Sequence, residues 1–383
     1  MLRLVSSITF DFNPFDPTKV DTDIGAGKLN IDFVNSVQVD ASVDSLTDTA
    51  RIILPRKYLG LLTQGTDPAK KGDTIIQGSN PQFKRGNKVT ISLGYDYNIV
   101  TGGQKLAPLM NTVFQGYISQ VIADAEIEII CEDAMFKLKQ VINTGYSTSN
   151  TSSIKLLDLL NVILPSWCKG SNLNCIDAVL GSDYRVKAGN SVAFELDRLT
   201  DLGFSFNFNN GVLFANLRYV TKDPLSAIKT ELKYERNIIS DDNMVYKRKD
   251  DLGIGLKCIS TNSKNVVVGP IYFNDTYPNG TSKTITLSGD VTNYKNNLGM
   301  DLATLTRTGQ EMYERFNFEG FTGYIETFLQ PTIMAGNAVK LLHDNIPEKN
   351  GIYLVKKVIT SFGANIGGRQ KIYLDRRIDI PKK

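Results

Sequence analysis

The sequence predicts a mainly β protein with an α+β insertion, and three observations carry this prediction. The chain has 383 residues, more than one domain usually holds, which favours two or three domains. Apolar residues alternate with polar ones in several runs, as in strands with one buried face. Helical spacing is confined to a few segments. We therefore expect β-rich domains at residues 1–145 and 226–383, on either side of a small α/β domain at residues 146–225.

The first 140 residues are dominated by strand patterns. From Ile31 to Val43 apolar residues fall at alternate positions, which is typical of a half-buried strand. Clusters of Gly, Pro, Asn and Asp separate this run from the next ones. The further strands are expected at residues 50–54, 88–93, 113–122 and 126–132. These runs predict antiparallel β-structure.

The middle third has the pattern of a small α/β domain. Residues 144–150 are rich in Ser, Thr and Asn, which is typical of a linker. We expect helices at residues 154–164 and 192–202, followed by a hairpin at residues 204–208 and 212–219. Pro165 ends the first helix, whereas Ser191 and Gly203 are the expected N-cap and left-handed C-terminal residue of the second.

Strand patterns return in the last third, with one helix among them. Strands are expected at residues 244–259, 284–287, 322–328, 339–342, 352–362 and 370–378. The helix is expected at residues 294–316, where apolar residues share one face and Glu311 stands four residues before Arg315.

A repeated motif connects the two β regions. The motif residues are Gly86, Asn87, Val89 and Ile91 in the first region and Gly336, Asn337, Val339 and Leu341 in the second. A longer strand (117–122 and 354–359) and a closing strand (127–131 and 371–374) follow in both regions. The alternatives are a duplicated unit and a coincidence between generic alternating strands, because period-2 patterns are common.

Composition excludes several classes of protein. The formal net charge is +3 with both signs interspersed, so no field indicates binding to nucleic acid. The N-terminus lacks a sustained apolar stretch, and the most apolar segment, residues 154–164, is short and carries Asp158. We expect neither a signal peptide nor a membrane span.

The four cysteines, Cys131, Cys168, Cys175 and Cys258, show neither CxxC spacing nor a disulfide framework. Synthesis in a reducing cytoplasm fits this pattern best. Cys168 and Cys175 are close enough in sequence to form a disulfide, but we expect free thiols.

Catalytic constellations are missing from the sequence. The single histidine, His343, lies at a strand end without a GxSxG motif, and no HExxH motif is present. Glu126, Glu128, Glu132 and Asp133 form an acidic cluster, and paired carboxylates can hydrolyse glycosides. The three glutamates share the outward parity of one strand, which favours a solvated face. The Gly25–Lys28 segment departs from a phosphate loop at both flanking positions. We expect no catalytic, cofactor or metal site.

These segments together resemble a known family. The marks in the first half are residues 31–43 and 49–55, RGNKV at 85–89, FQGYI at 114–118 and IICED at 129–133. The marks in the second half are FLQPTIMAGN at 328–337, GIYLV at 351–355 and GGR at 367–369. The sequence resembles the phage baseplate-hub or late-control-protein-D-like proteins, which include the Mu-type tail hub and the N-terminal region of VgrG spikes.

This resemblance implies a structural protein of a phage or phage-like contractile injection system. It implies two tube-like antiparallel β-barrels per chain, a homotrimer in the baseplate of the virion tail, and contacts with the tail tube protein, the spike or needle protein and other baseplate proteins. The sequence stops at Lys383 without a lysozyme domain or a β-helical needle, so we expect those functions to belong to other polypeptides. The alternative is a tail-associated glycan-binding or peptidoglycan-hydrolysing protein, which an exposed aromatic cluster beside paired carboxylates would indicate.

Overall fold

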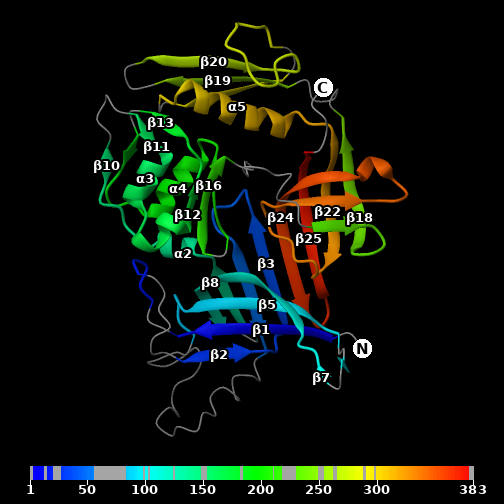
Figure 1. Cartoon of the computed structure of the whole chain (residues 1–383). Coiled ribbons are helices and arrows are strands. Elements are labelled where there is room, and N and C mark those ends of the chain that lie inside the picture. The colour runs from blue at the N-terminus through cyan, green and yellow to red at the C-terminus, as the bar shows by residue number, and fades with distance from the viewer. Residues whose placement is uncertain are drawn as a thin grey trace.

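The chain is built mainly from β-strands, as the sequence predicts (Figure 1). In the part that the structure describes, thirteen strands form one continuous sheet, and two smaller groups of strands and helices flank it. The computed structural model describes residues 3–12, 15–19, 27–55, 83–97, 100–101, 104–123, 126–147, 153–181, 184–209, 211–217, 230–248, 254–261, 265–287, 290–296 and 299–378.

The first ladder is the antiparallel part of this sheet that precedes residue 133. Its strands are β1 (Arg3–Asp11), β2 (Lys28–Ile31), β3 (Ser36–Ser42), β4 (Thr49–Leu54), β5 (Lys88–Asp96), β8 (Leu109–Ala123) and β9 (Ile127–Glu132). Their order across the sheet is β3-β4-β9-β8-β5-β1-β2. The sheet curls around one core, because Ile8, Ile52 and Ile129 from distant strands are packed together there. A short pair, β6 (Val100–Thr101) and β7 (Gln104–Lys105), lies between β5 and β8 in the chain.

The second ladder is the remaining part of the large sheet. Its strands are β17 (Thr230–Lys233), β18 (Ile238–Lys247), β22 (Gly320–Phe328), β23 (Ala338–Leu342), β24 (Gly351–Gly363) and β25 (Gly367–Arg377). Their order is β18-β22-β25-β24-β23-β17, and only the last pair is parallel. Ile325, Val358 and Ile372 lie in a core of its own.

β3 and β24 join the two ladders into one sheet. Residues 36–42 of β3 lie antiparallel to residues 357–363 of β24. In Figure 1 these strands stand side by side at the centre, blue beside red. The Lys357 ammonium nitrogen is 2.7 Å from a carboxylate oxygen of Asp40 across this seam.

Tyr95 reinforces the junction between the ladders. Its hydroxyl donates a hydrogen bond to the Gly368 carbonyl (3.2 Å) and accepts one from the Leu329 amide (3.3 Å). The side-chain amide of Asn111 also donates to the Thr332 hydroxyl (2.9 Å). Strand pairing and side-chain contacts therefore hold the same two parts together.

The α/β part has the two predicted helices and the predicted hairpin. Its elements are β10 (Tyr146–Ser147), β11 (Ile154–Lys155), α3 (Leu156–Ile163), β12 (Leu173–Cys175), β13 (Val179–Gly181), β14 (Arg185–Val186), α4 (Val192–Thr200), β15 (Phe204–Asn209) and β16 (Val212–Leu217), with 3₁₀ turns at Ser166–Cys168 and Gly170–Asn172. Ser191 caps α4 as predicted, because its hydroxyl accepts a hydrogen bond from the Phe194 amide (3.2 Å). α2 (Met135–Leu138) connects this part to the first ladder.

A second small sheet is inserted into the second ladder. It consists of β19 (Gly255–Thr261), β20 (Val267–Phe273) and β21 (Val291–Asn296), and α5 (Leu302–Phe316) packs against it. Gly309 allows this close packing, since a Cβ atom there would lie 2.7 Å from Cys258 Sγ. In Figure 1 α5 lies between β19 and the rest of the molecule.

The predicted strand at residues 31–43 was wrong in its extent, because it is two strands. Ile31 ends β2, which pairs with β1, whereas β3 begins at Ser36 and pairs with β4. Asn35 lies between them and donates its side-chain amide to Glu126 (2.6 Å). Alternation indicates which residues point inward, but not where a strand changes its partner.

The predicted helix at residues 294–316 began too early. Tyr294 lies in β21, and α5 begins at Leu302. Asp301 caps the helix, since its carboxylate accepts a hydrogen bond from the Thr304 amide (3.0 Å). The N-cap was therefore a better boundary signal than the apolar spacing before it.

Two further strand predictions were wrong. The strand expected at residues 244–259 is β18 and β19, which belong to different sheets. The sequence between them, with Asp250, Asp251 and Gly253, is a turn signal that outweighs the alternation. Residues 284–287 do not form a strand, because Leu287 packs against Gly255 of β19 instead of joining a ladder.

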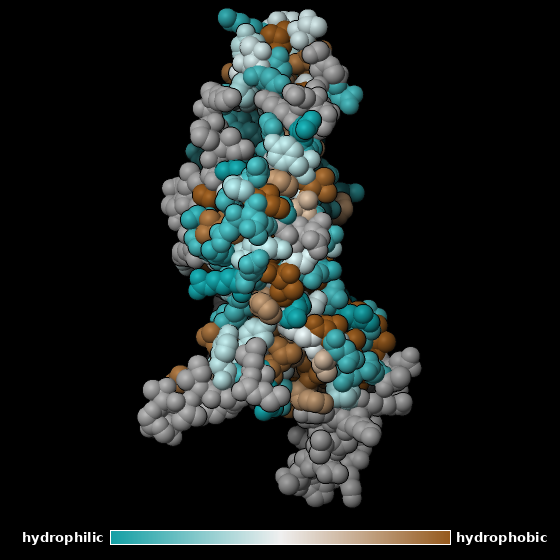
Figure 2. Space-filling model, turned by 90° about the vertical axis from the view of Figure 1, so that its right-hand side faces the viewer, coloured by the Kyte–Doolittle hydropathy of each residue, from teal (hydrophilic) through white to brown (hydrophobic). Residues whose placement is uncertain are grey.

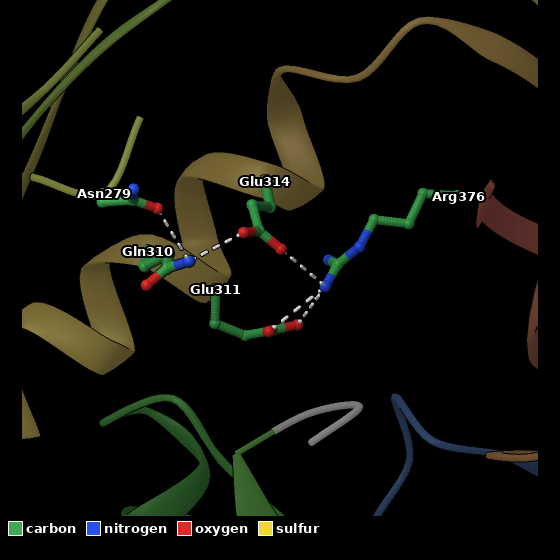
Figure 3. A network of polar contacts seen from close by, with 5 residues as sticks. All are labelled: Asn279, Gln310, Glu311, Glu314 and Arg376. Atoms are coloured by element: carbon green, nitrogen blue, oxygen red, sulfur yellow. Dashed lines mark hydrogen bonds and ion pairs between the residues drawn. The ribbon is translucent and has the colours of Figure 1, made fainter. Parts of the chain in front are cut away.

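Arg376 of β25 connects the second ladder to α5 (Figure 3). Its Nη2 atom lies 3.1 Å from Glu311 Oε1 and 3.4 Å from Glu314 Oε2. Burial raises the pKa of Glu311, and the Arg376 guanidinium opposes this rise. Gln310 extends the network by donating to Glu314 (2.9 Å). The inserted sheet is thus tied to the ladder by a largely buried ion pair.

We predict that Arg376→Met destabilises the protein by about 3–5 kcal/mol, because it leaves the largely buried Glu311 carboxylate without this cation. Thermal unfolding of the wild-type protein and of the variant would measure the difference in their free energies of unfolding. Lys371→Met is the matched control, since Lys371 lies on the same strand in a more exposed ion pair with Glu326. Its effect should stay below about 1 kcal/mol. Equal losses for both variants would contradict this account of Arg376.

Candidate functional site

The first Gly-Asn motif opens β5. The Gly86 amide donates to the Ile118 carbonyl (2.8 Å), and the Asn87 carbonyl accepts from the Ile118 amide (2.9 Å). Gly86 has a φ of +92°, which glycine adopts without the steric cost of a Cβ atom. The Asn87 side chain accepts a hydrogen bond from the Lys84 amide (2.6 Å) and so closes the turn before the strand.

The second Gly-Asn motif makes the same backbone bonds before β23. The Gly336 amide donates to the Val355 carbonyl, and the Asn337 carbonyl accepts from the Val355 amide, both at 2.8 Å. The φ of Gly336 is +84°. Ile118 and Val355 are the residues that the sequence repeat places at the same position.

The strands after the two motifs have the same arrangement. β5-β8-β9 and β23-β24-β25 are antiparallel in the same order, and the register shifts after Ile118 in β8 and after Val355 in β24. The inward residues of the motifs are Val89, Ile91, Val339 and Leu341, each at most 3% exposed. We propose from these pairings that the two ladders are copies of one unit.

A cavity of about 370 Å³ lies where the three parts meet. The first ladder contributes Asp48, the α/β part contributes Trp167 and Asn207, and the segment before β23 contributes Thr332. No single part of the chain forms this cavity, so its shape depends on how the parts are docked.

Lys137 of α2 lies beside this cavity and is almost fully buried. Its ammonium group donates to the Lys19 carbonyl (2.7 Å) and lies 4.5 Å from the centre of the Trp167 ring. Trp167 in turn donates its indole N–H to the Pro17 carbonyl (2.9 Å). These contacts attach residues 15–19 to the α/β part, and they give the lysine a structural role.

Asp48 and Asp133 line the same cavity as a pair of carboxyl groups. Burial raises the pKa of Asp48 to about 7, and burial together with the nearby Asp48 charge raises the pKa of Asp133. Backbone amides bind both carboxyl groups: Asp48 accepts from Ser42 (3.0 Å) and Asp133 from Met135 (2.9 Å). In the sequence Asp133 belongs to the acidic cluster, but only the three glutamates were assigned to the solvated face, and the structure shows that Asp133 is buried.

The three glutamates of the predicted acidic face do point away from the core. Glu128 receives two hydrogen bonds from Arg51, which lower its pKa, and Glu132 lies 2.6 Å from the Lys139 ammonium nitrogen. The alternation of buried and partly exposed residues along β9 is the predicted one. The glutamates therefore act as partners in ion pairs and hydrogen bonds.

His343 lies at the end of β23, as predicted, but is buried. Its ring stacks on Tyr234, with ring centres 4.2 Å apart, and Nδ1 accepts from the amides of Asn345 and Ile346. These bonds order the turn after the strand. In the described ranges, no group of three His, Cys, Asp or Glu side chains is placed to hold a metal ion.

The cysteines are free thiols, as expected. Burial raises the pKa of Cys168 and of Cys175 to about 12, so both are poor nucleophiles at neutral pH. The phosphate-loop candidate at Gly25–Lys28 begins outside the described residues. Among the helices that the structure describes, none is long and apolar enough to cross a membrane.

Two solved structures share this arrangement over nearly the whole chain. A tail protein from Neisseria meningitidis matches with a TM-score of 0.57 and 13% identity, over 97% of this chain and 96% of that one. The 43 kDa tail protein of prophage MuSo2 from Shewanella oneidensis matches with a TM-score of 0.52 and 13% identity, over 97% and 98% of the chains. The chain has the fold of phage tail proteins.

This tail-protein fold agrees with the family resemblance of the sequence. At the level of sequence, no family model and no curated protein matches the chain. The likeness therefore rests on the order and pairing of the elements across almost the full length of both tail proteins.

We predict that Asp48→Asn makes the protein more stable above pH 7, by about 1–3 kcal/mol. The raised pKa of Asp48 means that the native chain keeps this proton while the unfolded chain loses it. The free energy of unfolding of the wild type should therefore fall as the pH rises from about 4 to 7. In the variant this fall should be smaller. Asparagine keeps the acceptor for the Ser42 amide.

Urea unfolding at a series of pH values would measure this effect. Glu128→Gln is the control, because its pKa is lowered by Arg51 and its removal should reduce stability at neutral pH. An Asp48→Asn variant that is less stable than wild type at pH 8 would contradict the assignment of a raised pKa.

Proposed function

We propose that this protein is a non-enzymatic hub in the baseplate of a phage or phage-like contractile injection system. It works as a homotrimer at the tail tip, in the virion tail, after synthesis in the cytoplasm of the bacterial host. Its partners are the tail tube protein, the spike or needle protein and other baseplate proteins. We expect no sequence-specific contact with nucleic acid, and none of the described helices is long and apolar enough to span a membrane.

The observation that carries this proposal is the matched pair of ladders in one chain. The family resemblance implies a sixfold tail tube and a threefold spike, and a joining subunit must fit both. Three chains with two similar ladders each would present six ladders as a pseudo-sixfold ring, while the parts that occur once per chain stay threefold. The shared fold with two tail proteins supports the same reading.

The division of work within the chain follows from this symmetry. The domains that we propose, residues 1–145 and 226–383, contain the two ladders that would face the tube. The α/β domain at residues 146–225 and the inserted sheet occur once per chain, so they suit contacts with threefold or peripheral neighbours.

A non-enzymatic role is supported by the state of the acidic residues. Glu128 and Glu132 are held in ion pairs, and backbone amides bind both Asp48 and Asp133. General acid–base catalysis needs a carboxyl group that is within reach of a substrate proton. Each of these groups is instead engaged in holding strands or turns.

We predict three copies of this chain at the tip of each intact tail. Quantitative mass spectrometry of purified tails would give the ratio of this chain to the tube subunit, and averaged images would place it. A ratio that corresponds to six copies, or a position along the tube away from the tip, would refute the hub assignment even if the ladders proved equivalent.

A further inference from the structure

The strand that joins the two ladders has a counterpart at the far edge of the second ladder. The strand order β18-β22-β25 in the second ladder matches the order β3-β4-β9 in the first. The registers correspond as well. The row Val39, Ala50 and Cys131 across the first ladder matches the row Met244, Gly323 and Leu374 across the second. β18 is therefore the second ladder's equivalent of β3.

The strand that receives β3 also has a counterpart. After Val355, the edge of β24 passes from the Gly336-Asn337 motif to β3, starting with the bond from the Val43 amide to the Lys356 carbonyl (3.0 Å). After Ile118, the same edge of β8 leaves the Gly86-Asn87 motif and pairs with no strand among the described residues. β8 thus offers the acceptor edge that β24 fills inside the chain.

Exposure distinguishes the filled seam from the two open edges. At the filled seam Ile359 and Asp40 are directly opposite each other and partly buried. Their counterparts by register are Ile122 of β8 and Val245 of β18, which are 38% and 66% exposed. An exposed isoleucine and an exposed valine on open strand edges are features that natural proteins usually cover.

The two open edges lie on different sides of the molecule. β18 is at the right in Figure 1, and β8 lies to the left of β3. Figure 2 views the molecule from the side of β18, where hydrophobic residues break an otherwise hydrophilic surface. Val245 and Tyr246 of β18 belong to the exposed hydrophobic residues of this part. Edges on different sides suit a head-to-tail contact between copies rather than a twofold one.

We propose that β18 of one copy pairs antiparallel with residues 119–123 of β8 of the next copy, and so repeats the β3·β24 seam between chains. The register places Ile122 opposite Val245 and Gln120 opposite Lys247. This inference rests on the proposed function, because it names the contact by which the copies form a ring. Each chain gives one edge and receives one, so the contacts can close around an axis.

The pair Ile122–Val245 is well suited to a test. In the internal seam, Val43 and Lys356 form a hydrogen-bonded pair, and alternation makes Asp40 and Ile359 a non-hydrogen-bonded pair. Side chains of such pairs are the closer ones, with Cβ atoms about 4.5–5.5 Å apart. Cysteines at the corresponding positions of two neighbouring chains would come within reach of a disulfide.

The test is oxidative cross-linking of Ile122→Cys/Val245→Cys in the full chain with Cys175→Ser, since the other native cysteines are buried. Non-reducing electrophoresis should show covalent dimers and trimers. Each single variant should give no cross-link, whereas a mixture of the two single variants should give dimers only. Val245→Cys with Ile366→Cys, another exposed position, is the mismatched control.

Sedimentation of the same samples separates the possible failures. An oligomer that forms without the 122–245 link would overturn the proposed contact, and so would cross-links in the single variants. The hub assignment would then still be tested separately by the number of copies in intact tails. A chain that stays monomeric at every concentration would overturn the contact as well. If the cysteine variant does not fold, Val245→Lys should abolish the oligomer and added Ile122→Glu should restore it; no rescue would count against the pairing.

Discussion

Seven residue pairs between β3 and β24 hold the two ladders in one sheet, and the placement of the other parts follows from this seam. The seam fixes the angle between two separate cores, one inside each ladder. Tyr95 bonds across the same junction, and the cavity with Asp48 forms only because the α/β part meets both ladders beside it. A β-seam is a strong form of such a junction, because every backbone group along it gains a partner.

The seam also explains why a duplicated ladder is useful. A sheet edge invites pairing with another strand, and proteins either cover such edges or use them. Within the chain, β3 is the edge strand of the first ladder, and it pairs with β24 of the second ladder. If the second ladder is a copy, its edge strand carries the same geometry outward, and a closed ring of copies would cover both the β18 edge and the free edge of β8. The two ladders are not identical, since β17 is parallel to its neighbour and β1 is antiparallel.

Much of the fold could be predicted from local patterns. Alternation located β5, β9 and β25, and capping and glycine signals located α4, because these features depend on neighbouring residues only. The predicted fold class is confirmed. β1 was missed although Ile8 and Phe10 alternate with Ser7 and Thr9, so its signal was present in the sequence and was overlooked.

Other features depend on contacts that sequence cannot supply. The break between β2 and β3 is set by a change of partner strand, and the burial of Asp133 is set by α2 and Asp48. The acidic cluster was correctly interpreted at Glu128, where parity along β9 decides, whereas parity gave no prediction for Asp133, where the strand has already ended. The inserted sheet was missed as a unit for the same reason, because β21 pairs with β19 across a long stretch of chain.

The central claim is that two equivalent ladders per chain build a ring, and one measurement tests it most directly. Electron cryo-microscopy of the assembled hub, averaged without imposed symmetry, would show the ladders and the single-copy parts at different heights along the axis. The account predicts six similar sheets at near-sixfold positions in one layer and threefold density in the layer of the α/β part. A twofold dimer, or a ring in which first ladders contact only first ladders, would contradict it.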